Sequence, residues 1–345
     1  MKIGNFTIDD KSPVFIIAEL SANHNGSLDN ALATIKAAKR AGADCIKLQT
    51  YTADTITLDS DKEDFVIKGT IWDGKKLHTL YQEAYTPWEW HEQIYRVAKE
   101  EGLICFSSPF DKTAVDLLES LNSPAYKIAS FEITDIPLIE YVASKGKPVI
   151  ISTGIARQED IELALDACHR MGNYDVALLK CTSSYPAPIE EANMCMVKDL
   201  AERYNVISGL SDHTMGSTVP VVATVFGAKI IEKHFIIDRA IGGPDASFSM
   251  NEEEFTAMVK AVREAEKASG VVDYNLTEKQ AKGRDFSRSL YIAEDIKAGE
   301  IFTEKNLRSV RPGFGLHPKY YNQLLGKKAT THLEKGTPMQ LDFAE

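Results

Sequence analysis

Short, mostly apolar runs alternate eight times with longer amphipathic segments over most of the chain. Each run has four or five residues, which suits parallel strands that are buried on both faces. The predicted strands cover residues 15–19, 45–49, 104–107, 125–128, 149–152, 176–180, 207–211 and 230–234. Eight strands that are each followed by a helix predict an α/β fold, the (β/α)8 TIM barrel. A doubly wound open sheet is the alternative that this pattern leaves open.

The segments between these runs have the periodicity and the stop signals of helices. The segment 28–41 places Leu32 and Ile35 at a helical interval and stops at Gly42. Glycine is expected after the last turn because it adopts a positive φ without steric cost. A strand or hairpin over residues 3–7 is expected to close the bottom of the barrel. The other expected helices cover residues 88–101, 112–121, 137–144, 161–171, 194–204, 217–226 and 252–268.

The character of the sequence changes near Asp273, which suggests a domain boundary. We expect a TIM-barrel domain over residues 1–272, a polar linker over 273–284 and a small β-rich domain over 285–345. Runs at 289–293 and 308–312, with glycine-containing turns nearby, indicate short strands. A module of about 60 residues has a marginal core, so it is expected to lean on another part of the protein.

Charge and cysteine content restrict the partners that this sequence fits. The net charge is −11 at pH 7, which argues against nucleic acid, because phosphate backbones require clustered lysine and arginine. The five cysteines are scattered and odd in number, as is typical of free thiols in a reducing compartment. No apolar run reaches the roughly 20 residues that span a membrane, and no signal peptide is recognisable. We therefore expect a cytoplasmic protein with no membrane partner.

All eight predicted strands end in polar side chains, and the active site of a barrel lies at these C-terminal ends. Lys47 and Lys127 follow apolar residues there, and a buried lysine needs a partner. Several serines and threonines share the same rim, so an anionic ligand such as a phosphate or carboxylate is the favoured partner. Pairing with an internal glutamate such as Glu19 is the alternative.

His213 and His234 follow the seventh and eighth predicted strands, which are neighbours in a barrel. Two adjacent imidazoles suit a borderline divalent ion, with water or substrate oxygens in the remaining positions. This pair is the predicted metal site.

At these strand ends the sequence resembles the sialic acid synthase family (N-acetylneuraminate synthase and its relatives). The tail resembles the antifreeze-like (SAF) domain of that family, and the resemblance covers nearly the whole chain. The matching stretches are Ala18-Glu19, Asn23-His24-Asn25-Gly26, Lys47-Leu48-Gln49, Ser107-Ser108-Pro109-Phe110, Tyr126-Lys127-Ile128-Ala129-Ser130-Phe131-Glu132, Ser152-Thr153-Gly154, Leu210-Ser211-Asp212-His213, Ile231-Glu232-Lys233-His234-Phe235 and, in the tail, Arg288-Ser289-Leu290 and Val310-Arg311-Pro312-Gly313.

Within the family, the sequence is most similar to the branch that makes pseudaminic acid. Ser183 stands where the neuraminate branch tends to have asparagine, and Ser21-Ala22 replaces another pair. Both differences lie near the expected sugar site and argue against N-acetylmannosamine as the substrate. The supporting stretches are Glu19-Leu20-Ser21-Ala22-Asn23-His24, Gln49-Thr50-Tyr51-Thr52, Asp61-Lys62-Glu63-Asp64-Phe65, Lys180-Cys181-Thr182-Ser183 and Gly313-Phe314-Gly315-Leu316-His317-Pro318.

The resemblance implies an enzyme that condenses phosphoenolpyruvate with 2,4-diacetamido-2,4,6-trideoxy-L-altrose and water to give pseudaminic acid and phosphate. His213 and His234 would hold Mn²⁺, with Mg²⁺ or Co²⁺ as alternatives, to polarise the sugar aldehyde. Glu19 would stabilise charge at carbon 2 or help to deliver water, and Asp245 would order a water at the ion. The implied phosphoenolpyruvate contacts are Lys47, Lys127, Ser130, Ser152 and Ser211, and the further substrate contacts are Gln49, Ser108, Glu132, Ser183 and Tyr185.

Arg311 resembles the family residue that reaches from the small domain into the barrel of a partner subunit. This implies a domain-swapped homodimer, which would also stabilise the small domain. From the sequence alone, a surface arginine without a ligand is the simpler interpretation.

Three other functions remain open at this point. The same chemistry on a different sugar would give N-acetylneuraminate or legionaminate. A metal-dependent aldolase that uses pyruvate is a second alternative, although two rim lysines with many hydroxyls favour a ligand with two anionic groups. A barrel scaffold with an ice- or polysaccharide-binding tail is the third.

Overall fold

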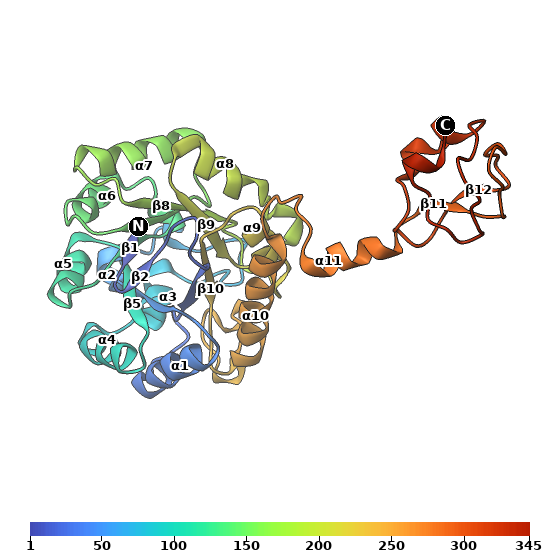
Figure 1. Cartoon of the computed structure of the whole chain (residues 1–345). Helices are drawn as coiled ribbons and strands as arrows, with labels where there is room; N and C mark the ends of the chain where they lie inside the picture. Colours follow the sequence, from blue (N-terminus) through green and yellow to red (C-terminus); the bar gives the residue numbers. More distant parts are fainter. The chain divides into compact units, whose positions relative to one another are not determined.

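The computed structural model describes residues 1–345, which form two compact units, Met1–Gly270 and Val271–Glu345. In the first unit, eight parallel strands close into a barrel in the order β10-β3-β4-β5-β6-β7-β8-β9 (Figure 1). This closure confirms the predicted (β/α)8 barrel and excludes the open sheet. The barrel strands are β3 Phe15–Glu19, β4 Cys45–Thr50, β5 Ile104–Pro109, β6 Tyr126–Ile128, β7 Val149–Ser152, β8 Val176–Cys181, β9 Ile207–Asp212 and β10 Ile230–His234.

Helices surround the barrel, and each expected helix is present with ends shifted by a few residues at most. The exception is the segment 88–101, which divides into η2 Trp88–Trp90 and α4 His91–Glu100. Short 3-10 turns on the rim are η3 Ser130–Glu132, η4 Ile189–Glu191, η5 Arg239–Ile241 and η6 Ala246–Phe248. The remaining outer helices are α1 Leu28–Arg40, α5 Lys112–Ser120, α6 Ile136–Ala143, α7 Gln158–Arg170, α8 Cys195–Tyr204, α9 Thr218–Val225 and α10 Glu252–Ser269.

Successive side chains of each barrel strand point alternately inward and outward. In β3, Phe15 and Ile17 belong to a buried cluster inside the barrel, whereas Ile16 and Ala18 pack in the layer between strands and helices. The next inward position on β3 is therefore Glu19. Apolar side chains fill the barrel interior near the N-terminal ends of the strands. Polar side chains that point inward therefore occur near the C-terminal strand ends.

A short hairpin closes the N-terminal end of the barrel, as the sequence predicts. Its strands are β1 Lys2–Ile3 and β2 Phe6–Thr7, which pair antiparallel. Ile3 and Ile8 are fully buried and join the cluster inside the barrel. This apolar plug leaves the opposite end of the barrel for the site.

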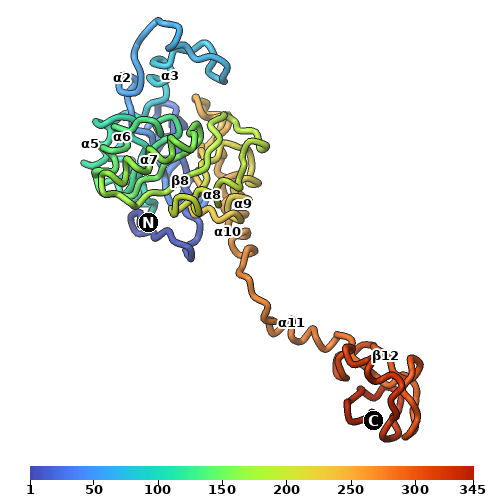
Figure 2. Tube along the Cα trace, turned by 90° about the horizontal axis from the view of Figure 1, so that it is seen from above, coloured from blue at the N-terminus to red at the C-terminus, as the bar shows by residue number.

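Residues 51–86, here called the β4–η2 segment, form an extension that the sequence analysis did not assign. It contains α2 Ala53–Ile56, η1 Glu63–Phe65 and α3 Leu77–Ala84. Its two ends are held together at the barrel, because the Trp88 indole donates to the Tyr51 carbonyl at 3.2 Å. Thr50 Oγ1 and His91 Nε2 lie 2.8 Å apart beside this contact. Figure 2 shows the segment at the end of the barrel opposite the N-terminus.

The second unit has a small apolar core of its own. Strands β11 Ser289–Ile292 and β12 Leu307–Val310 pair antiparallel, and Leu290 and Phe302 are among the buried side chains. The segment expected to be a linker contains a short helix, α11 Glu278–Gly283. The remaining elements are η7 Arg284–Phe286, η8 Pro318–Tyr320, α12 Tyr321–Leu324 and η9 Leu341–Phe343. No helix of the chain is both long enough and apolar enough to cross a membrane.

Candidate active site

Two buried lysines lie side by side inside the C-terminal end of the barrel. Lys47 on β4 and Lys127 on β6 are each 2% exposed. Lys47 Nζ donates to Ser108 Oγ at 3.2 Å, and Lys127 Nζ donates to Ser152 Oγ at 2.7 Å. Both ammonium groups approach one carboxylate oxygen of Glu232, at 3.6 Å and 3.8 Å respectively. The structure thus brings four of the predicted substrate residues together.

Two carboxylates accompany these lysines. Glu19 pairs with Lys47 through Oε2 at 2.5 Å, whereas its other oxygen has no hydrogen-bond partner. Glu232 accepts a hydrogen bond from Ser211 Oγ at 3.1 Å, whereas its other oxygen has no partner. The lysines therefore have internal partners, which was the alternative left open by the sequence, but one oxygen of Glu19 and one of Glu232 still lack a donor.

The charges in this cluster are strongly interdependent. Burial raises the pKa of Glu19 to about 7, with Lys47 opposing the change and Glu232 adding to it. Burial would also raise the pKa of Glu232, but the Lys127 and Lys47 ammonium groups lower it. Glu232 is thus the carboxylate that stays ionised, and Glu19 is the one that gains or loses a proton near neutral pH.

The two predicted metal ligands are neighbours, with His213 directly after β9 and His234 at the end of β10. The ring centroids of His213 and His234 lie 5.2 Å apart. His213 Nδ1 lies 2.9 Å from the Thr182 carbonyl, so that it carries the proton and leaves Nε2 as the acceptor. Burial, with His213 nearby, lowers the pKa of His234 well below its usual value. His234 is therefore neutral and has lone-pair character, as a metal ligand requires.

The protein side chains at this position could supply only some of the ligands of a metal ion. His234 Nδ1 is buried without a hydrogen-bond partner and lies 3.8 Å from the Asp245 carboxylate. Asp245 also accepts a hydrogen bond from Ser21 Oγ. No group of three or more His, Cys, Asp or Glu side chains has metal-site spacing. The chain thus offers two nitrogen donors, and substrate or water would supply the other ligands.

Cys181 is a neighbour of this pair. Its Sγ lies 3.9 Å from His213 Nδ1. Burial would raise the pKa of the thiol, but the contact with His213 lowers it. The thiol is buried within the barrel wall, so it packs against the imidazole and is not an open nucleophile.

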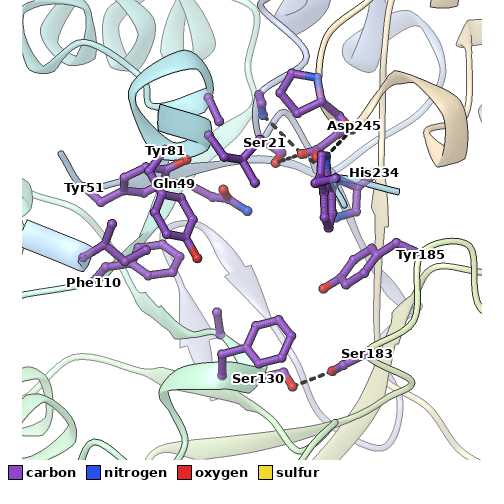
Figure 3. A pocket seen from close by; sticks show the side chains of 18 of the residues that line it. Ser21, Gln49, Tyr51, Tyr81, Phe110, Ser130, Ser183, Tyr185, His234 and Asp245 are labelled. Carbon is purple, nitrogen blue, oxygen red and sulfur yellow. Dashed lines mark hydrogen bonds and ion pairs between the residues drawn. The ribbon is translucent and has the colours of Figure 1, made fainter. Parts of the chain in front are cut away.

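A cavity of about 300 Å³ opens beside the imidazoles. Figure 3 shows His234, Tyr185 and Asp245 on one side of it, and Ser130 and Ser183 at one end. The Ser130 and Ser183 hydroxyls lie 2.6 Å apart. A Cβ at Gly154 would clash with both hydroxyls, so glycine permits their contact. Gln49 also lines the cavity.

Glu132 on η3 contributes a carboxyl group to the same cavity. One of its oxygens is buried without a hydrogen-bond partner. Burial raises its pKa to about 7, and Lys127 opposes the shift. An unpartnered carboxyl group that faces a cavity has free capacity to bind a hydroxyl or amide of a ligand.

Arg311 is the one predicted site residue that belongs to the second unit. It follows β12, its side chain is exposed and it forms no salt bridge within the chain. The role that the sequence assigned to it stays a prediction.

Sequence reasoning missed Glu232 and the β4–η2 segment. Glu232 lies two positions before His234 on β10, so both side chains point inward. This two-residue spacing is the signal that would have identified it. By the same rule Lys233 points outward, where it pairs with Asp212 at 2.5 Å.

Two known family models match this chain, one over the barrel and one over the second unit. The NeuB family model matches residues 34–274, and the SAF domain model matches residues 287–343. The chain belongs to the NeuB family, which confirms the resemblance noted in the sequence and the assignment of the tail as a SAF domain.

Individual relatives match over almost the full length. The chain is 53% identical to a pseudaminic acid synthase of Campylobacter jejuni over 340 residues, which covers 99% of this chain and 98% of that protein. It is 47% identical to a pseudaminic acid synthase of Helicobacter pylori, with 96% and 98% covered. The crystal structure of the spore coat polysaccharide biosynthesis protein SpsE from Bacillus subtilis has a TM-score of 0.69 and 34% identity, with 100% and 99% covered.

Proposed function

We propose that this chain is a nonulosonic acid synthase that condenses phosphoenolpyruvate with 2,4-diacetamido-2,4,6-trideoxy-L-altrose and water, giving pseudaminic acid and phosphate. The observation that carries the proposal is the buried pair of Lys47 and Lys127 at the same barrel end as the adjacent imidazoles of His213 and His234, where His234 lines a cavity. Similarity to pseudaminic acid synthases over nearly the whole chain supports the choice of sugar.

The lysine cluster is suited to the anionic groups of phosphoenolpyruvate. Lys47 and Lys127 supply positive charge, and the hydroxyls of Ser108, Ser152 and Ser211 surround them. In a buried site such charge-assisted hydrogen bonds are strong and directional. They would hold phosphate and carboxylate so that carbon 3 faces the sugar aldehyde, because C–C bond formation needs close alignment of the two carbons.

Glu19 is suited to the next part of the reaction. Attack by carbon 3 leaves a cationic centre at carbon 2 of the former phosphoenolpyruvate. A buried carboxylate with one oxygen free of any hydrogen-bond donor can stabilise positive charge nearby. Because its pKa is raised to about 7, Glu19 can also accept a proton from attacking water near neutral pH. Cleavage of the C–O bond then releases phosphate.

His213 and His234 would hold a divalent cation, for which Mn²⁺ is the first candidate. Such an ion supplies Lewis acidity at the sugar aldehyde. The chain itself keeps the His234 imidazole neutral and orients His213 through the Thr182 carbonyl. Asp245 lies next to His234 and would order a water there.

The test of the reaction is phosphate release from phosphoenolpyruvate in the presence of Mn²⁺. We expect turnover with 2,4-diacetamido-2,4,6-trideoxy-L-altrose and little with N-acetylmannosamine, since Ser183 and Ser21-Ala22, which the resemblance sets apart from the neuraminate branch, line the cavity. Turnover with N-acetylmannosamine alone would keep the mechanism and contradict the proposed sugar. No release with either sugar would leave the legionaminate, pyruvate-aldolase and scaffold alternatives to be tried in turn.

We also propose that the protein is a cytoplasmic homodimer in which Arg311 of one chain completes the site of the other. Five free cysteines fit a reducing compartment. The exposed, unpaired Arg311 has a guanidinium group that suits a carboxylate or phosphate ligand. In that arrangement the SAF domain would gain a second surface to pack against.

Replacement of Arg311 by alanine should lower turnover at least tenfold without changing thermal stability, because the side chain is exposed. Arg308→Ala, at an exposed arginine of β12, is the matched control and should keep wild-type turnover.

A second experiment tests whether Arg311 acts in the site of the partner chain or in that of its own chain. Arg311→Ala and Lys127→Met chains are co-expressed with different affinity tags, so that mixed dimers can be purified. Mixed dimers isolated through both tags should show about half of the wild-type activity if the chains are swapped, because one of their two sites is intact. No recovery would contradict the swap.

A further inference from the structure

The cavity has two chemically different walls. The wall formed by strand ends and rim turns carries polar groups, among them Gln49, Ser130 and Glu132. The other wall comes largely from the β4–η2 segment, and no charged side chain of that segment lines the cavity. The segment contributes Tyr51, Ile56, Trp72, Leu80, Tyr81 and Ala84, with Thr70 as its one aliphatic hydroxyl. Figure 3 shows Tyr51 and Tyr81 across the cavity from His234.

This apolar wall is held in place by ring packing. The Tyr51 ring contacts Tyr81 and Phe110 edge-to-face, with centroids 5.6 Å and 5.1 Å apart. Such pairs stabilise one arrangement beyond the burial of their area. Leu80 is 7% exposed, so its side chain is buried while still lining the cavity. The wall is therefore preformed, and a ligand meets a fixed surface.

A second contact fixes the wall to the opposite rim. The Trp72 indole N–H donates to the Pro244 carbonyl at 3.3 Å. The Trp72 ring also lies near Tyr185, with centroids 5.9 Å apart. The segment thus spans the cavity from the β4 side to the loop that carries Asp245. A bound sugar would be enclosed between the polar strand ends and this apolar surface.

The chemistry of the two walls matches a sugar that carries both polar groups and several methyl groups. The sugar of the proposed reaction has two acetamido methyls and a methyl at carbon 6, whereas N-acetylmannosamine has one acetamido methyl and a hydroxymethyl. A hydroxyl placed against Leu80 or Ala84 would lose its water without gaining a partner. The methyl groups would instead gain contact with apolar carbon.

We propose that the β4–η2 segment determines which sugar the enzyme accepts, and that Leu80 and Ala84 receive methyl groups of an N-acylated 6-deoxy sugar. This inference rests on the proposed function, because it takes the cavity as the sugar site. It assigns the choice of sugar to a segment that is separate from the phosphoenolpyruvate cluster. Leu80 and Ala84 therefore select the substrate but take no part in bond making.

Leu80→Asn tests the inference, because it exchanges an apolar side chain for a polar one of similar shape. The readout consists of two ratios. In the first, kcat/KM for the altrose derivative is divided by kcat/KM for its 6-hydroxy analogue, and in the second it is divided by kcat/KM for its 2,4-diformamido analogue. We expect at least one ratio to fall by about 10-fold or more, since loss of one well-packed apolar group changes discrimination by roughly 10–200-fold. The KM for phosphoenolpyruvate should stay within about twofold of wild type.

Leu58→Asn is the matched control, because Leu58 lies in the same segment and is 67% exposed. Leu80→Met should keep both ratios, and Ala84→Ser introduces a hydroxyl with little change in volume if Leu80→Asn does not fold. A merely structural role would lower the rates with all three sugars equally and leave both ratios unchanged, which would overturn the inference.

Failure of the proposed function gives a different result. In that case the wild-type enzyme itself would not turn over the altrose derivative, and the inference would fall with it. If the wild-type enzyme turns over the altrose derivative but both ratios are unchanged in Leu80→Asn and Ala84→Ser, the inference is wrong and the proposed function stands.

Discussion

Lys127→Met should lower kcat/KM for phosphoenolpyruvate by about 30-fold to several thousand-fold. Removing one member of a buried, hydrogen-bonded charge pair costs about 2–5 kcal/mol, and each 1.4 kcal/mol is a factor of ten. The Lys127 ammonium donates to Ser152 and lies 3.8 Å from Glu232, so its loss removes positive charge from the proposed phosphate and carboxylate site. Steady-state phosphate release measures the effect.

Lys180→Met is the control for this experiment. Lys180 is on β8 of the same barrel, is partly buried and donates to the Cys181 carbonyl at 2.8 Å. Its loss should leave turnover near the wild-type rate. Thermal unfolding of both variants separates loss of fold from loss of binding. A Lys127→Met enzyme that is folded and has wild-type kcat/KM would refute the assigned role.

His234→Ala, or an excess of EDTA, should reduce turnover by at least about 100-fold. The reason is that His213 and His234 are the two nitrogen donors of the proposed metal site, and removal of even an outer-shell partner typically costs 10–100-fold in metal affinity or activity. Calorimetric titration with Mn²⁺ should show binding to the wild type and none to His234→Ala. Added Mn²⁺ should restore the EDTA-treated wild-type enzyme.

His169→Ala is the matched control, since His169 lies on α7, away from the site, and stacks on Tyr174. It should bind Mn²⁺ and turn over as the wild type does. Full activity in the presence of chelator would rule out the metal role of the histidine pair.

The barrel strands could be predicted from the sequence because each is a short apolar run buried on both faces. The run that begins at Phe15, for example, ends at Glu19 in the structure as it does in the prediction. Helix stops at glycine were equally informative, since Gly42 has a φ of +88° directly after α1. These signals are local, so neighbouring residues suffice to show them.

The site was predictable only in part, because its contacts join residues that are far apart in the chain. Lys47 and Lys127 were recognisable as strand-end lysines, but their shared partner Glu232 depends on the register of β10. The contact between Ser130 and Ser183 depends on a close approach at Gly154. No local pattern in the sequence encodes these distances.

The β4–η2 segment was missed for another reason. Its helices α2 and α3 are short, with 4 and 8 residues, and short helices carry little periodicity. Their positions follow from packing against the rim, as the contacts of Tyr51 with Tyr81 and Phe110 show.

The two ends of the β4–η2 segment lie close together, and this has a consequence for how such enzymes diversify. Tyr51 and Trp88 join the two ends of the segment, so the chain leaves the barrel and returns to it at nearly one place. Doubling the length of a loop costs only about 0.6 kcal/mol of closure entropy. This one segment could thus be exchanged between homologous barrels, in evolution or by protein engineering. Such an exchange would change which nine-carbon product is made and leave the residues of the condensation reaction unchanged.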